Sequence, residues 1–119
     1  MNNFFKPKAR YNVAVRTKSG GRTYHSKAEA VYAQRLAWRL KVGELLEVVP
    51  QYRIDMKVKG VHWRYYRVDF RIVLKSGAVE YHEFKGYATE EFKMKWDLLH
   101  ILREEILEPG AALVLVTKL

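Results

Sequence analysis

Two acidic residues and a lysine have the types and spacing that metal-assisted hydrolysis needs. Asp69 lies in the apolar segment RVDFRI, and Glu83 and Lys85 lie in the segment YHEFKG that follows it. Residues two apart on a strand point to the same face, so Glu83 and Lys85 share a side. Neighbouring carboxylates repel each other unless a cation lies between them, and such oxygen ligands suit Mg²⁺ or Mn²⁺ together with a phosphate substrate. Lys85 can then orient or deprotonate a water molecule.

The turn between these two segments decides whether Asp69 joins that face. A three-residue loop at 75–77, with Gly77 in the left-handed conformation, places Asp69 directly opposite Glu83. A two-residue turn instead pairs Asp69 with Phe84 and sends the two carboxylates to opposite faces. The sequence is compatible with both loops, and the metal site requires the first.

A structural interpretation of the same residues also stays open. Asp69 and Glu83 could be solvated residues on the wet face of an antiparallel sheet, with Lys85 as a cross-strand ion-pair partner. The surrounding apolar residues and Gly86, where the chain must turn away from a crowded position, favour the functional interpretation.

A further carboxylate lies at the start of an expected helix. Ser26 and Glu29 form the S-x-x-E capping box, and the helix is predicted to run to about Val42 and to stop at Gly43. The stripe predicted to face the core consists of Glu29, Ala33, Leu36 and Leu40. Glu29 is therefore either a cap alone or a cap that also reaches a site on the sheet.

The remaining pattern predicts three more elements around the Asp69–Glu83 hairpin. A strand runs from Glu47 to Val58, and Pro50 confines its start to a sheet edge or a bulge. Thr89 caps a second helix that ends at Pro109. The apolar run 111–117 predicts a last strand, buried on both faces. The order α-β-β-β-α-β defines an α/β fold with a mixed central sheet flanked by helices.

Composition and charge limit the classes of function. The chain has 119 residues, 22 basic against 13 acidic side chains, a net charge of +9 and no cysteine. This length predicts one domain, and the charge predicts a polyanionic partner, with nucleic acid as the default. No apolar run suits a membrane span or a signal peptide, so a cytoplasmic location without membrane contact is expected. Thiolate zinc sites and disulfides are excluded.

Basic residues form an expected arm, residues 1–25, and a surface on the single domain, residues 26–119. The arm interleaves cations with aromatic residues and could contact phosphates, or it could be a solvated tail. Two lysines of the second helix could hold the substrate backbone or be ordinary exposed lysines. The residues expected to contact DNA are Lys6, Lys8, Arg10, Arg22, Lys27, Gln51, Arg53, Arg64, Arg67, Lys93 and Lys95.

The element order, Asp69, the E-x-K of Glu83 to Lys85 and the helical Glu29 together resemble the PD-(D/E)XK nuclease superfamily. The segments YHSKAEAVYAQRLAWRLKVGEL, RVDFRI and EFKGYATEEFKMK are similar to small phage-encoded proteins of that superfamily. The resemblance, over roughly residues 24–102, implies a restriction-endonuclease-like core. It also implies Asp69 and Glu83 as metal ligands, Glu29 as an auxiliary catalytic and metal-binding carboxylate, and Lys85 as the catalytic lysine.

Two departures from that pattern are visible. The proline of the superfamily's name is replaced by Val68, which is a common loss. The glutamine that often precedes the strand proline is replaced by Val49, and Gln51 lies one position beyond Pro50 instead. The second departure leaves any role for a strand glutamine open.

The resemblance leads to an expected activity and two alternatives. The leading hypothesis is a Mg²⁺-dependent DNA endonuclease, with Mn²⁺ as a substitute and no small-molecule cofactor. It would act as a homodimer on four-way junctions like a Holliday junction resolvase, in the host cytoplasm if phage-encoded. The chain is small, so recognition of DNA shape is expected rather than of a long sequence. The alternatives are a nicking or end-processing nuclease that serves replication or packaging, and a catalytically silent DNA-binding module.

Overall fold

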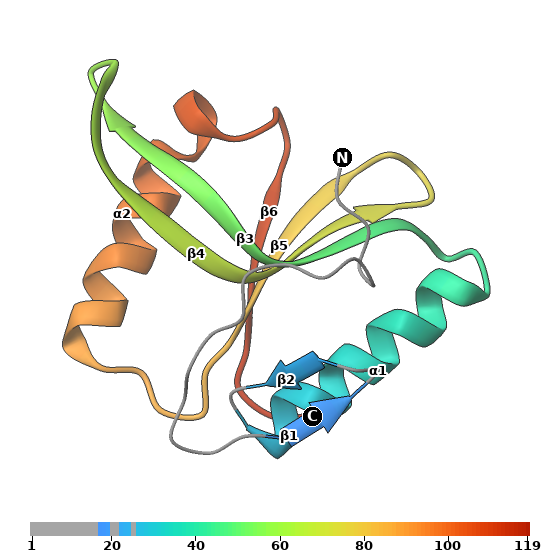
Figure 1. Cartoon of the computed structure of the whole chain (residues 1–119). Coiled ribbons are helices and arrows are strands. Elements are labelled where there is room, and N and C mark those ends of the chain that lie inside the picture. Colours follow the sequence, from blue (N-terminus) through green and yellow to red (C-terminus); the bar gives the residue numbers. More distant parts are fainter. Residues whose placement is uncertain (1–16, 20–21, 25) are drawn as a thin grey trace.

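The computed structural model describes residues 17–19, 22–24 and 26–119 of the chain (Figure 1). Its elements are β1 (Thr17–Ser19), β2 (Arg22–Tyr24), α1 (Lys27–Lys41), β3 (Leu45–Val58), β4 (Val61–Leu74), β5 (Val79–Phe84), α2 (Glu90–Ile106) and β6 (Ala112–Val116).

The main sheet has the strand order β3-β4-β5-β6 and confirms the predicted fold class. Strands β3, β4 and β5 pair antiparallel, whereas β6 pairs parallel with β5 because α2 carries the chain back across the sheet. Helices α1 and α2 lie on opposite sides of this mixed sheet (Figure 1). Before α1, β1 and β2 form a separate two-stranded antiparallel sheet beside that helix, within the segment predicted as a basic arm.

Side-chain caps define where both helices begin, as the sequence predicts. The Glu29 N–H donates to Ser26 Oγ at 3.1 Å, and the Phe92 N–H donates to Thr89 Oγ1 at 3.1 Å. Helix α1 ends before Gly43, which takes the left-handed conformation at φ +87°. Among the described residues, no helix is long and apolar enough to cross a membrane.

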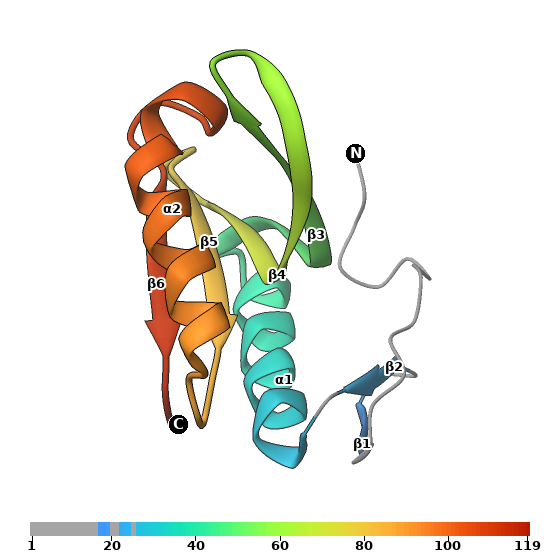
Figure 2. The ribbon, with the colours of Figure 1, turned by 90° about the vertical axis from the view of Figure 1, so that its left-hand side faces the viewer.

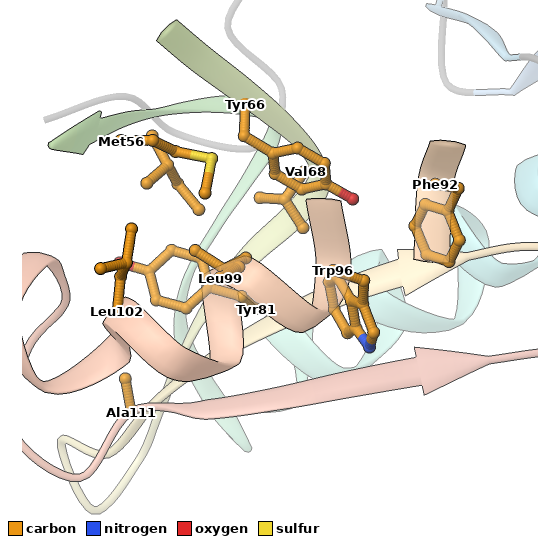
Figure 3. Packing of buried hydrophobic residues seen from close by; sticks show 10 residues of the cluster. Met56, Tyr66, Val68, Tyr81, Phe92, Trp96, Leu99, Leu102 and Ala111 are labelled. Carbon is orange, nitrogen blue, oxygen red and sulfur yellow. The ribbon is translucent and has the colours of Figure 1, made fainter. Parts of the chain in front are cut away.

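Each helix covers its own group of buried side chains. Helix α2 buries Phe92, Trp96, Leu99 and Leu102 against β3, β4 and β5 (Figure 3). Leu102 is buried on the inner side of α2, whereas the neighbouring Arg103 is half-buried. Helix α1 buries Ala30, Ala33 and Leu36 against the other side of the sheet.

Polar contacts also attach the helices to the sheet. Tyr32 on α1 hydrogen-bonds His82 Nδ1 on β5, and the second ring nitrogen of His82 lies 2.9 Å from Glu80. Buried Arg71 on β4 pairs with Glu47 and with Glu108, just beyond α2. These contacts hold the start of α1 and the end of α2 in defined positions against the sheet.

The sheet changes face at Asp69. Alternate residues of a regular strand share a face, yet Val68 packs under α2 and Phe70 packs under α1. On the edge strand β3, directly after Pro50, Gln51 has a φ of +52°, which is uncommon for a residue other than glycine. The predicted edge position of Pro50 is confirmed, and the irregularity beside it brings Gln51 close to Asp69.

The last strand corrects one expectation. Strand β6 is the other edge of the sheet, its residues are mostly half-buried, and 40% of Leu115 is exposed. Burial of both faces requires a layer packed over each face, and this cover is incomplete at the edge of the sheet. The apolar run 111–117 alone does not reveal that β6 is an edge strand.

Candidate functional site

The loop between β4 and β5 has the three-residue form. The Leu74 N–H donates to the Ala78 carbonyl at 2.8 Å, and the Gly77 N–H donates to the Leu74 carbonyl at 2.8 Å. Gly77 has a φ of +94°, the conformation that such a loop requires of its last residue. The predicted loop is therefore confirmed.

This loop determines which side chains meet across β4 and β5. The strands pair from Val73–Val79 through Phe70–His82, and one further step of the same register places Asp69 opposite Glu83. Asp69 and Glu83 lie near enough for the negative charge of Asp69 to raise the pKa of the Glu83 carboxyl. The two residues line different pockets, and Lys85 lines both.

Asp69 is held in one orientation from two directions. The Phe84 N–H donates to Asp69 Oδ2 at 2.7 Å, and Gln51 Nε2 donates to Asp69 Oδ1 at 3.3 Å. A carboxylate has about four lone-pair sites, so a carboxylate that accepts hydrogen bonds can also bind a cation. Gln51 is half-buried and bonded to Asp69, and the DNA contact expected from the sequence stays a prediction.

Glu83 is a buried carboxyl group whose negative charge is poorly compensated. Only 5% of the residue is exposed, and Oε1 has no hydrogen-bond partner among the described residues. Lys85 Nζ lies 3.7 Å from the other oxygen, Oε2. Burial and then the charge of Asp69 raise the pKa of Glu83 to about 8, against the lowering effect of Lys85.

Tyr66 is a neighbour of Glu83 that the sequence analysis missed. Its hydroxyl is buried beside the Glu83 carboxyl and makes no hydrogen bond of ordinary length to a described residue. Burial, followed by the charges of Glu83 and Asp69, raises the pKa of the Tyr66 hydroxyl above its ordinary value. Tyr66 belongs to the buried cluster under α2, and no local signal in the sequence identifies its neighbour on β5.

Glu29 and Lys85 complete the site from two other elements. Glu29, in the first turn of α1, is 3% exposed, and its charge also raises the pKa of Glu83. Glu29, Asp69 and Lys85 line one pocket with a volume of about 500 Å³. Glu83 and Lys85 line a second pocket of about 300 Å³, so Lys85 lies between the two. Its ammonium group also lies 5.0 Å from the centre of the Phe92 ring.

The donors in this site fit a hard divalent cation. Among the described residues, no three carboxylate or imidazole groups come close enough to one another to form a complete protein cage. Mg²⁺ commonly binds through one or two carboxylates and takes its other ligands from water and phosphate. Asp69 with the unpartnered Glu83 Oε1 provides two such carboxylates, and Glu29 lines the same pocket as Asp69.

The cations expected to contact DNA differ in how accessible they are. The exposed ones are Lys27, Arg53, Arg64, Arg67 and Lys93, and Lys95 is one-third exposed. Lys93 and Lys95 each form an ion pair on their own helix, with Glu90 at 3.1 Å and Glu91 at 3.4 Å. Arg22 lies in β2, whereas Lys6, Lys8 and Arg10 lie outside the described residues.

Two of these cations adjoin the carboxylates. Arg67 and Lys95 line the 300 Å³ pocket together with Glu83 and Lys85. A phosphate backbone in that pocket would meet the cations Arg67, Lys85 and Lys95 beside the carboxylates of Glu83 and Glu91.

Residues 8–107 match the family model described as "Protein of unknown function (DUF1064)", and the chain belongs to this family. Comparison with curated proteins gives no match.

Proposed function

We propose that this protein is a Mg²⁺-dependent DNA endonuclease that hydrolyses phosphodiester bonds. The observation that carries the proposal is the pairing of half-buried Asp69 on β4 with buried Glu83 on β5. The charge of Asp69 acts on the Glu83 carboxyl, and one buried oxygen of Glu83 has no hydrogen-bond partner among the described residues. A divalent cation would compensate both charges, and Mn²⁺ would substitute for Mg²⁺.

The residues around this pair support distinct roles in hydrolysis. Asp69 and Glu83 would hold the metal, which supplies charge neutralisation and polarises the phosphate. Lys85, whose ammonium group lies 3.7 Å from Glu83 Oε2, would orient the attacking water and offset the developing negative charge. Glu29 would hold a metal-bound water from the neighbouring pocket.

Charge supports DNA as the substrate. The chain carries a net charge of +9, and Arg67 and Lys95 line the pocket that contains Glu83 and Lys85. Phosphate contacts of this kind position a backbone without reading sequence, so the proposed enzyme selects DNA by structure. We include in the proposal a homodimer that cuts four-way junctions in the cytoplasm during recombination or replication.

The proposal is tested by cleavage of defined substrates. The wild-type protein and the Asp69→Asn variant are incubated with four-way junction, flap, single-stranded and duplex DNA, with Mg²⁺ or with EDTA. We expect cleavage only by the wild-type protein and only with the metal. DNA binding without cleavage under every metal condition would assign the protein to the silent DNA-binding modules and overturn the proposal.

A further inference from the structure

The distal part of the β3–β4 hairpin extends beyond the main sheet. Strand β5 pairs with β4 only from Phe70 to Val73, so residues 53–67 form a two-stranded ribbon (Figures 1 and 2). One face of this ribbon packs on α2 through Ile54, Met56 and Tyr66. The other face and the tip are exposed to solvent. We refer to residues 53–67 as the ribbon.

The ribbon carries strong positive charge. It contains five basic residues, Arg53, Lys57, Lys59, Arg64 and Arg67, against the single acidic residue Asp55. A ribbon with this charge is suited to a polyanion, and two antiparallel strands have the width that a DNA groove admits.

An irregularity in the ribbon turns Trp63 outward. Met56 pairs with Arg64 but Lys57 pairs with His62, so Trp63 is the extra residue of a β-bulge. Trp63 is 43% exposed, and the guanidinium group of Arg64 lies 4.2 Å from the centre of its ring. A large exposed indole beside a cation is the combination that stacks on an unpaired base and contacts the adjacent phosphate.

The neighbouring Tyr65 has a different role. Its ring lies between the Arg53 guanidinium group, at 4.2 Å, and the His62 ring, at 4.5 Å. The Tyr65 ring is thus contacted by two side chains, whereas Arg64 is the one described contact of the Trp63 ring, so we assign the stacking role to Trp63. Tyr65 and Arg67 also line the pocket that holds Glu83 and Lys85, which connects the ribbon with the candidate active site.

From these contacts we propose that the ribbon recognises DNA in which an unpaired base adjoins a duplex, by stacking that base on Trp63. This inference rests on the proposed nuclease function and names its substrate class as branched or partly melted DNA. Arg67 lies four positions after Trp63 on β4, a span of about 13 Å along the strand.

Binding is measured on the cleavage-deficient Asp69→Asn protein, with a forked DNA that carries 2-aminopurine at the branch and with a matched duplex. A second substitution in this protein, Trp63→Ala, should weaken fork binding about tenfold, equivalent to about 1.4 kcal/mol of stacking. The same substitution should weaken duplex binding less than threefold. Trp63→Phe should retain most of the preference and the quenching of 2-aminopurine. Trp38→Ala, at an exposed tryptophan on α1, is the matched control and should bind as the parent does.

Three results would overturn the inference. The first is equal loss of fork and duplex affinity in Trp63→Ala. The second is the same loss for heparin, which has charge but no bases. The third is a dimer that Trp63→Ala dissociates without DNA, which would assign the indole to a subunit contact.

Cleavage on the wild-type background separates this inference from the proposed function. Cleavage of forks with an unchanged fork-to-duplex ratio in Trp63→Ala would remove the role of the ribbon and leave the nuclease intact. Stacking on Trp63 without any Mg²⁺-dependent cleavage would support the ribbon as a DNA-binding surface and overturn the proposed nuclease activity.

Discussion

Replacing Glu83 with glutamine should stabilise the metal-free protein while it removes the proposed activity. Glutamine has nearly the same shape as glutamate but carries no charge. The buried Glu83 carboxyl has an oxygen without a hydrogen-bond partner among the described residues and faces Asp69. A residue that served only structure would lose stability on this change.

The raised pKa determines the sign and size of the effect. Glu83 has a pKa of about 8 in the folded protein, against 4.5 ordinarily, through burial first and the charge of Asp69 second. Between these two values the unfolded chain binds fewer protons, so the folded state loses stability as pH rises through this window. At pH 7 the loss is about 3 kcal/mol at most, since each pKa unit is worth about 1.4 kcal/mol.

Thermal melting at two pH values measures this contribution. In EDTA at pH 8, Glu83→Gln should melt roughly 5 °C or more above the wild-type protein. The variant has no buried carboxyl to ionise and therefore avoids the loss of stability that this ionisation causes. At pH 5, where folded wild-type Glu83 is protonated, the two proteins should melt within a few degrees of each other. Saturating Mg²⁺ should raise the wild-type melting temperature at pH 8 and leave the variant unchanged.

A different pattern would refute the reasoning. If Glu83→Gln melts below the wild-type protein by the same amount at both pH values, Glu83 is a structural partner of Lys85 rather than an uncompensated metal ligand. If Mg²⁺ stabilises both proteins equally, the metal binds elsewhere.

The remaining predictions concern the other groups around Asp69. Asp69→Asn should abolish cleavage and leave the metal-free melting temperature equal or higher, and wild-type cleavage by this variant would contradict the metal assignment. Glu29→Gln retains a side chain that suits the capping box, so its melting temperature should stay within a few degrees of wild type. Its single-turnover cleavage rate should fall about tenfold or more. An unchanged rate under saturating Mg²⁺ would show that Glu29 is purely structural. Gln51→Gly relieves the positive φ of +52° but removes the amide that holds Asp69, so the rate should fall without a loss of melting temperature. A lower melting temperature with an unchanged rate would show that Gln51 serves only the fold.

Local chemistry made much of the fold predictable. Ser26 and Thr89 define the helix starts because a hydroxyl satisfies a free N–H wherever it precedes a helix. Gly77 favours the three-residue loop because it adopts positive φ without steric cost. That one loop propagates a register along two strands, so the sequence could place Asp69 opposite Glu83, although it also allowed the shorter turn.

The tertiary structure alone decided how these side chains are surrounded. Gln51 reaches Asp69 because β3 is irregular beside Pro50, and Tyr66 lies near Glu83 because β4 changes the face that it presents to α2. Such contacts depend on strand pairing and helix packing between residues far apart in the chain, and no periodicity encodes them. The sequence by itself determined which groups are available for chemistry, whereas burial between the sheet and its helices decided the charge state of Glu83.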